Sequence, residues 1–163
     1  MVQTKQRIEL GDHLQPAGAS AIPTICDDAT VSASDKTVDW IERQYETVDG
    51  MDMDGFLSFI ADEAQLRFGN NEPASGHDQI RGAIGEFWDS IEDLRHEFIG
   101  IWEQDDVVVL EASIRYTKLD GEAVYIPVTT IIERDGGTVT ASRIYGDMAP
   151  LYDVDPDEAP LIC

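Results

Sequence analysis

The C-terminal half of the chain holds four consecutive segments with the pattern of β-strands, joined by short turns. The segments cover residues 95–103, 107–119, 124–134 and 138–145. The turns between them are Gln104-Asp105-Asp106, Leu119-Asp120-Gly121-Glu122 and Asp135-Gly136-Gly137. Turns this tight join antiparallel neighbours, because a parallel pair needs a crossover of about a dozen residues or more. The pattern therefore predicts an antiparallel four-stranded meander.

Three segments with helical periodicity precede the predicted meander. Their apolar stripes are Val38, Ile41, Tyr45 and Val48; Met53, Phe56, Leu57 and Ile60; and Ile80, Ile84, Phe87, Trp88 and Ile91. Ser34 or Asp35 can cap the first helix, and Asp49-Gly50 ends it. Residues 65–68 alternate polar and apolar side chains, which predicts a short strand at the margin of the sheet. Helices ahead of a meander predict the α+β class.

The length and the charge of the chain limit its organisation and its partners. A chain of 163 residues predicts one domain, here residues 36–152, preceded by a partly disordered extension (1–35) and followed by an acidic tail (153–163). The net charge is −22, from 33 acidic and 11 basic residues. Binding to phosphate backbones or anionic lipids needs basic patches, so neither nucleic acid nor a membrane is an expected partner.

The rest of the composition predicts a cytoplasmic protein without a metal or a cofactor. Cys26 and Cys163 stand far apart and are expected to be free thiols in a reducing compartment. No apolar run reaches the ~20 residues of a membrane span, and residues 1–10 lack the apolar core of a signal peptide. The three histidines are scattered, and the chain has no phosphate-binding loop, dinucleotide fingerprint or nucleophile elbow.

Several short motifs follow one another in a characteristic order. They are Gly50-Met51-Asp52-Met53-Asp54-Gly55, Ala61-Asp62-Glu63-Ala64, Glu72-Pro73-Ala74-Ser75-Gly76, Ile80-Arg81 and Arg143-Ile144-Tyr145-Gly146-Asp147-Met148. Together they resemble the NTF2-like superfamily, in its SnoaL-like and ketosteroid-isomerase-like branch, over residues 36–152. The resemblance implies a strongly curved sheet wrapped around the three helices as a cone that is open at one end.

The resemblance also allows the ketosteroid isomerase residues to be placed on this chain. The general-base aspartate of that enzyme falls on or beside Phe68, its helix tyrosine on Gln44, and its protonated aspartate on Thr129. None of the three is retained. Because a phenyl ring, an amide and a hydroxyl cannot move a proton at the α-carbon of a ketone, steroid isomerisation by that mechanism is not expected.

Dehydratases and cyclases of the superfamily often carry a histidine on the strand after the third helix, where this chain has His96. A histidine that titrates near neutral pH can both accept and donate a proton, so His96 is the first catalytic candidate, with Tyr45 and Tyr116 as hydroxyl donors. A strand histidine among apolar residues also fits a packing role, and both interpretations stay open. The expected lining of the pocket is Gln44, Phe68, Trp88, Trp102, Ile114 and Thr129.

These residues favour a cofactor-independent enzyme that uses general acid–base chemistry on a small, apolar, oxygenated metabolite. Isomerisation, dehydration and cyclisation all fit. One alternative is a non-catalytic binding or dimerisation protein of the same fold. Another is a hydrolase similar to limonene epoxide hydrolase, which would need Arg143 and a carboxylate such as Asp147 in the pocket. A homodimer is also expected, through an apolar convex sheet face made of Val107, Val109, Val128, Thr130 and Ile132.

Overall fold

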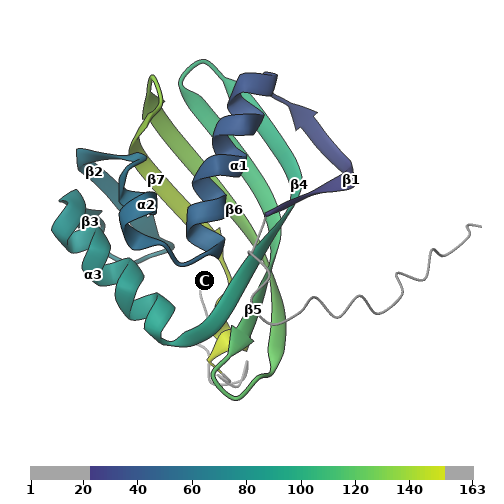
Figure 1. The fold of residues 1–163 in the computed structure, drawn as a ribbon, viewed down its shortest axis with the longest axis vertical. Coiled ribbons are helices and arrows are strands. Elements are labelled where there is room, and N and C mark those ends of the chain that lie inside the picture. The colour runs from purple at the N-terminus through teal and green to yellow at the C-terminus, as the bar shows by residue number, and fades with distance from the viewer. Residues whose placement is uncertain (1–22, 153–163) are drawn as a thin grey trace, which may run out of the picture.

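The computed structural model describes residues 23–152. In chain order, its elements are β1 (Thr24–Ser32), α1 (Asp35–Asp49), α2 (Met53–Leu57), β2 (Ile60–Phe68), β3 (Ala74–Ser75), α3 (Gly76–Asp89), β4 (Ile91–Gln104), β5 (Val107–Lys118), β6 (Ala123–Asp135), β7 (Thr138–Gly146) and the 3-10 helix η1 (Ala149–Leu151). Figure 1 shows the helices gathered on one face of a strongly curved sheet, with α1 lying across its hollow. Within this range, no helix is both long and apolar enough to span a membrane.

The strands form one mixed sheet in the order β1-β4-β5-β6-β7-β2-β3. Strands β4 to β7 pair antiparallel in sequence order, so the predicted meander is confirmed. The α+β class with three helices ahead of the meander is confirmed as well. The sheet is not antiparallel throughout, however, because β1 pairs parallel to β4 and β2 pairs parallel to β7. Both parallel pairs have the long connections that such pairs need, since several elements, α3 among them, lie between β1 and β4 and between β2 and β7.

Two edge regions were not predicted in full. Strand β1 lies inside the segment expected to be an extension, and β2 begins at Ile60 instead of Gln65. Most of β1 is exposed, so its sequence lacks the apolar alternation of a half-buried strand. The register of β2 shifts between Ile60 and Gln65, which breaks its alternation. Residues 1–22 and 153–163, the remainder of the extension and nearly all of the tail, lie outside the described residues.

A bulge in β4 changes which of its side chains face the helices. The pairing with β5 shifts between Phe98 and Gly100, so that Phe98 and Ile101 are both fully buried while Ile99 is 40% exposed. Trp102 therefore lies on the convex face, although it was expected in the pocket. Its indole covers Gly100, where an added Cβ would come within 1.9 Å of the ring.

The register of β6 also differs from the predicted one by a single residue. Thr130 pairs with Leu110 on the concave face, and Thr129 pairs with Glu111 on the convex face. Val128, Thr130 and Ile132 are buried, so the expectation that they form an apolar convex surface is wrong. A shift of one residue exchanges the two faces of a strand, which is why Thr129 leaves the expected lining. Val107 and Val109 remain on the convex face and are half-buried.

Polar contacts around Glu103 fasten the start of α1 to β4 and β6. The Glu103 carboxylate accepts hydrogen bonds from the Thr37 hydroxyl, the Ser34 backbone N–H at 3.0 Å and the Arg134 guanidinium. The guanidinium also lies over the ring of Trp40, 4.9 Å from the ring centre. The bond from Thr37, followed by those from the Ser34 backbone and from Arg134, lowers the pKa of Glu103 to about 2.

Glu103→Gln is expected to lower the free energy of unfolding by about 1–3 kcal/mol at pH 7, because hydrogen bonds to a charged group are lost. The pKa of Glu103 is lowered in the folded state, so its contribution is complete above the ordinary value of 4.5 and is lost as the pH falls toward 2. Urea denaturation between pH 7 and 2 should show the two proteins converging in acid. Glu42→Gln, on the exposed face of α1, is the control. A constant difference across this range would contradict the assignment.

Candidate functional site

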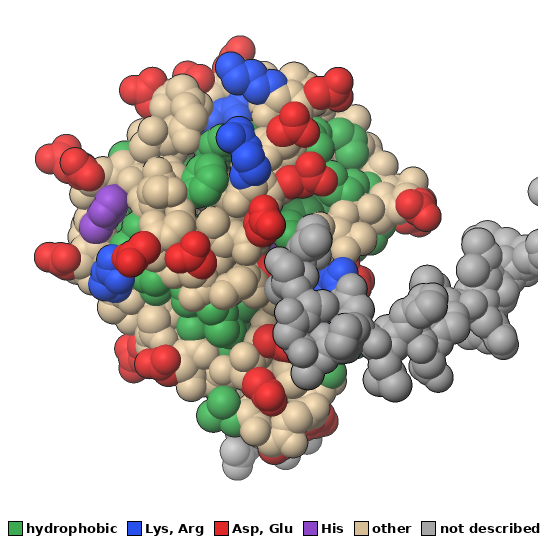
Figure 2. Space-filling model, in the orientation of Figure 1, with side chains coloured by type: hydrophobic (Ala, Val, Ile, Leu, Met, Phe, Trp, Pro, Cys, Tyr) green, Lys and Arg blue, Asp and Glu red, His purple; other side chains and the backbone are tan. Residues whose placement is uncertain are grey.

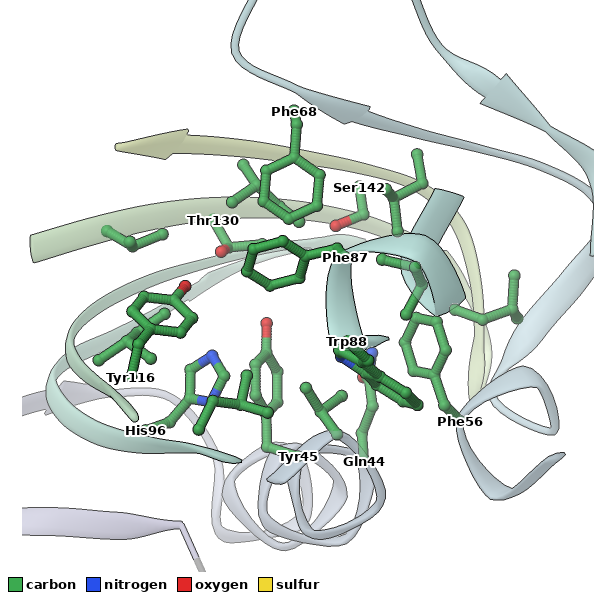
Figure 3. Close-up of a pocket in the computed structure, with 18 residues that line it drawn as sticks. Gln44, Tyr45, Phe56, Phe68, Phe87, Trp88, His96, Tyr116, Thr130 and Ser142 are labelled. Carbon is green, nitrogen blue, oxygen red and sulfur yellow. The ribbon is translucent and has the colours of Figure 1, made fainter. Parts of the chain in front are cut away.

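A cavity of about 70 Å³ lies between the helices and the concave face of the sheet. Its walls come from α1, α2, α3 and the five strands β2 and β4 to β7. They consist of Gln44, Tyr45, Val48, Phe56, Ile60, Leu66, Phe68, Ile84, Phe87, Trp88, Leu94, His96, Ile114, Tyr116, Val128, Thr130, Ser142 and Ile144. Most of these side chains are apolar, and Figure 3 shows His96 and Tyr45 on one side of the cavity and Thr130 and Ser142 on the other.

His96 is held by a buried carboxylate at the end of α1. Its ring Nδ1 lies 2.5 Å from Asp49 Oδ1, and its backbone N–H donates to Asp49 Oδ2 at 2.9 Å. The Asp49 side chain is fully buried and the His96 side chain is 9% exposed. One carboxylate therefore fixes both the ring and the backbone of the histidine.

This pairing determines which ring nitrogen is available for chemistry. An ionised carboxylate can only accept hydrogen bonds, so Nδ1 carries the proton that is shared with Asp49. The other nitrogen, Nε2, is then the basic one. Figure 3 shows the ring pointing into the cavity near the hydroxyl ends of Tyr45 and Tyr116. A histidine oriented by a buried carboxylate and open to a cavity is an arrangement suited to proton transfer.

Two tyrosine hydroxyls complete this side of the cavity. The Tyr45 ring packs edge-on against His96, with 4.7 Å between the ring centres. Burial raises the pKa of Tyr45, against the effect of a hydrogen bond from Thr130, and burial also raises the pKa of Tyr116. Both hydroxyls therefore stay protonated at neutral pH and can act as hydrogen-bond donors.

Gln44 lies on the other side of Tyr45. Its side-chain amide oxygen, Oε1, is buried and has no hydrogen-bond partner among the described residues. A buried acceptor without a partner costs about 1–3 kcal/mol, whereas an apolar side chain of the same shape would avoid that cost. The amide is thus an unused polar group in the wall of a mostly apolar cavity.

The structure brings together most of the residues expected at the site. Seven of them line the cavity, namely Gln44, Tyr45, Phe68, Trp88, His96, Ile114 and Tyr116. Trp102 and Thr129 do not, because of the β4 bulge and the β6 register. The catalytic and binding roles of the seven stay predictions.

Sequence reasoning missed Asp49, Thr130 and Ser142. Asp49 was interpreted as the end of a helix. One signal could have identified it: Asp49 follows Tyr45 by four residues and so continues the apolar stripe of α1. A buried carboxylate in the last turn of a helix also opposes the helix dipole, which marks it as unusual.

The residues needed for epoxide hydrolysis do not meet at the cavity. Arg143 lies on the convex face, where its guanidinium donates to Glu133 at 2.7 Å. Asp147 is exposed and accepts a hydrogen bond from the Ala149 backbone N–H. Among residues 23–152, no three His, Cys, Asp or Glu side chains come close enough together to hold a metal ion.

An outer depression of about 620 Å³ adjoins the cavity. Phe68, Phe87 and Ile144 belong to the walls of both spaces and therefore separate them. The rings of Phe68 and Phe87 are 5.8 Å apart, and Phe87 is also 5.8 Å from Tyr116. The far side of the depression is more polar and includes Asn70, Asn71, Glu86, Ser90 and Tyr152.

Comparison with solved structures confirms the predicted NTF2-like fold. A 1.30 Å structure of an NTF2-like protein of unknown function from Burkholderia pseudomallei has a TM-score of 0.66 and 16% identity, covering 74% of this chain and 97% of that one. A protein from Jannaschia sp., provisionally described as a SnoaL-like polyketide cyclase, has a TM-score of 0.64 and 17% identity, covering 74% and 94%. TerC, co-crystallised with polyporic acid, has a TM-score of 0.63 and 18% identity, covering 71% and 95%.

At these sequence identities, the structural similarity establishes the fold of this chain but not its activity. No sequence among curated proteins matches this chain at a significant level. The model of the SnoaL-like domain family matches residues 41–142, which include both members of the Asp49–His96 pair and all the residues that line the cavity except Ile144. The chain therefore belongs to the SnoaL-like domain family.

Proposed function

We propose that this chain is a cofactor-independent enzyme in which His96 acts as a general acid–base on a small, apolar, oxygenated metabolite. The observation that carries the proposal is the Asp49–His96 pair, whose ring opens onto an apolar cavity. The reaction would be an isomerisation, a dehydration or a cyclisation of a carbonyl compound that begins with removal of a proton from the carbon next to the carbonyl group. The description of the Jannaschia relative supports the same class of chemistry.

The geometry suggests a separate role in proton transfer for each of these residues. His96 Nε2 would take a proton from the carbon next to the substrate carbonyl, and the electron pair of that C–H bond would form an enolate. Asp49 would stabilise the imidazolium formed, and a hydroxyl of Tyr45 or Tyr116 would donate to the enolate oxygen. Because burial raises the pKa of Tyr45, its hydroxyl keeps the proton that this role requires. Return of the proton from Nε2 to another atom of the substrate would complete an isomerisation.

The exchange of α-protons tests this proposal without knowledge of the natural substrate. Small cyclic ketones such as cyclohexanone and 1-indanone would be incubated with the protein in D₂O, and deuterium incorporation would be followed by proton NMR. Incorporation above the rate in buffer is expected with the wild-type chain. If the ketones bind, as judged by chemical-shift changes, but exchange no faster than in buffer, the catalytic proposal fails.

That outcome would favour the second candidate, a binding protein with the same cavity. One observation supports it, because the three isomerase positions hold Phe68, Gln44 and Thr129, none of which can serve as a base.

We also propose that the convex face of the sheet forms a homodimer. Trp102, Val109 and Ile131 are cross-strand neighbours there, and they form an apolar row over β4, β5 and β6. Exposed Ile99 and Tyr125 lie on the same outer surface. This row replaces the residue set that the sequence predicted for the interface.

Light scattering at micromolar concentration and 0.15 M salt is expected to give twice the chain mass of 18.1 kDa. Val109→Asp should shift the mass toward the monomer, because it places a charge within the apolar row. Asn70→Asp, which adds the same charge on an exposed turn, should leave the dimer intact. A monomeric wild-type chain would refute the dimer proposal.

A further inference from the structure

We propose that Gln44 selects the ligand of this cavity, and that the ligand is an uncharged molecule presenting an O–H or N–H group to Gln44 Oε1. The inference rests on the proposed function in one respect, namely that this cavity is where the ligand binds. It starts from the amide oxygen, which is buried and lacks a partner, on a residue that is 4% exposed.

The position of Gln44 separates it from the proton-transfer group. Figure 3 shows Gln44 and His96 on opposite sides of Tyr45, with the Gln44 amide beneath Trp88. A ligand that reaches Gln44 therefore lies across Tyr45 and can place a second polar group near His96. The labelled neighbours on the Gln44 side are the rings of Phe56 and Trp88 (Figure 3). A ligand donor would give Oε1 the partner that these neighbours do not supply.

The charges around the cavity restrict the ligand further. No Lys or Arg lines the cavity and its histidine is already paired with Asp49, so a carboxylate or phosphate would enter it without a free counter-ion. The chain as a whole carries a net charge of −22, and Figure 2 shows carboxylates spread over the face that carries the helices. An anionic ligand would be repelled on approach and would remain unpaired once inside.

The volume of the cavity indicates how much of the ligand it holds. About 70 Å³ admits a small polar end together with a few carbon atoms. The body of a larger ligand would pass Phe68 and Phe87 into the outer depression. The ligand class is therefore an uncharged, oxygenated molecule with its hydrogen-bond donor on the buried end.

Three probe molecules test the hydrogen-bond donor and the charge of the ligand separately. Phenol has the donor, anisole has the same ring with the hydroxyl methylated, and benzoate carries a negative charge. Their binding would be measured by NMR chemical-shift titration against the wild type, Gln44→Leu and the control Gln65→Leu. Gln65→Leu makes the same change at an exposed position of β2, outside the cavity. The wild type is expected to bind phenol about tenfold more tightly than anisole, as one hydrogen bond allows, and not to bind benzoate. Gln44→Leu should abolish this preference and Gln65→Leu should keep it.

Thermal denaturation of the ligand-free proteins gives a second readout. Gln44→Leu removes an unpartnered buried acceptor, so its Tm is expected to equal or exceed that of the wild type. A fall of more than about 4 °C would show that the amide oxygen already has a partner, and would overturn the assignment. Equal binding of phenol and anisole, or binding of neither probe, would overturn it as well.

These outcomes can be told apart from failure of the proposed catalysis. If the wild type exchanges ketone α-protons but shows no preference for phenol, only the role of Gln44 is wrong. If the preference depends on Gln44 but no exchange occurs, the cavity is a binding site and the acid–base role of His96 is wrong.

Discussion

His96→Gln is expected to fold normally and to reduce enzyme-promoted exchange of ketone α-protons at least ~100-fold, the low end of a general acid–base contribution. Glutamine keeps much of the size and one hydrogen bond with Asp49, but it cannot take up and return a proton. The rate of deuterium incorporation checks this directly. Circular dichroism and the Tm would show that the variant is folded.

Tyr45→Phe is the matched comparison for this experiment. It preserves the edge-on ring contact with His96 and removes only the hydroxyl. If Tyr45 is a hydrogen-bond donor and His96 the base, Tyr45→Phe should retain part of the exchange activity that His96→Gln loses. Undiminished exchange in His96→Gln would show that another group is the base, and would leave His96 with a packing role.

The second large effect is expected at Asp49. Asp49→Ala leaves the His96 ring and its backbone N–H without their buried partner, and should lower the free energy of unfolding by about 3–5 kcal/mol. Asp49→Asn should fold better, since its amide oxygen can still accept one hydrogen bond. It should nevertheless exchange α-protons at least ~100-fold more slowly, because an amide can hold the ring in the wrong tautomer and provides no charge to stabilise the imidazolium.

Urea denaturation and the deuterium assay together test the two Asp49 variants. Asp89→Asn is a suitable control, because Asp89 also ends a helix but is exposed. It should leave both measurements almost unchanged. A stable Asp49→Ala variant with full exchange activity would show that the carboxylate neither supports the fold nor orients the histidine.

Local signals in the sequence were sufficient for most of the fold. The turns at Asp120-Gly121 and Asp135-Gly136-Gly137 defined the hairpins, and helical periodicity identified the faces of α1 and α3. These signals depend on neighbouring residues, so they can be detected without knowledge of the tertiary structure. The two parallel pairings, β1 with β4 and β2 with β7, join distant segments and left no local pattern to detect.

The candidate site could be predicted only where the strands are regular. His96, Ile114 and Tyr116 lie on regular stretches of β4 and β5, and all three line the cavity as expected. Trp102 comes after a bulge, and the face of Thr129 depends on the exact register of a hairpin, so both were misplaced. The contact between Asp49 and His96 spans 47 positions of the chain, and no spacing rule connects a helix end with a strand at that distance.

The two margins of the sheet affect the tendency of the protein to aggregate at high concentration. An open strand edge can template the addition of a strand from another molecule, which leads to fibrous aggregation. Here one margin is β3, which is only two residues long. The other is β1, whose pairing is interrupted between Ile25 and Thr30 by a stretch that contains Asp27 and Asp28. Neither margin is a long, flat and uncharged strand edge. The addition of a strand from another molecule is therefore disfavoured at both margins.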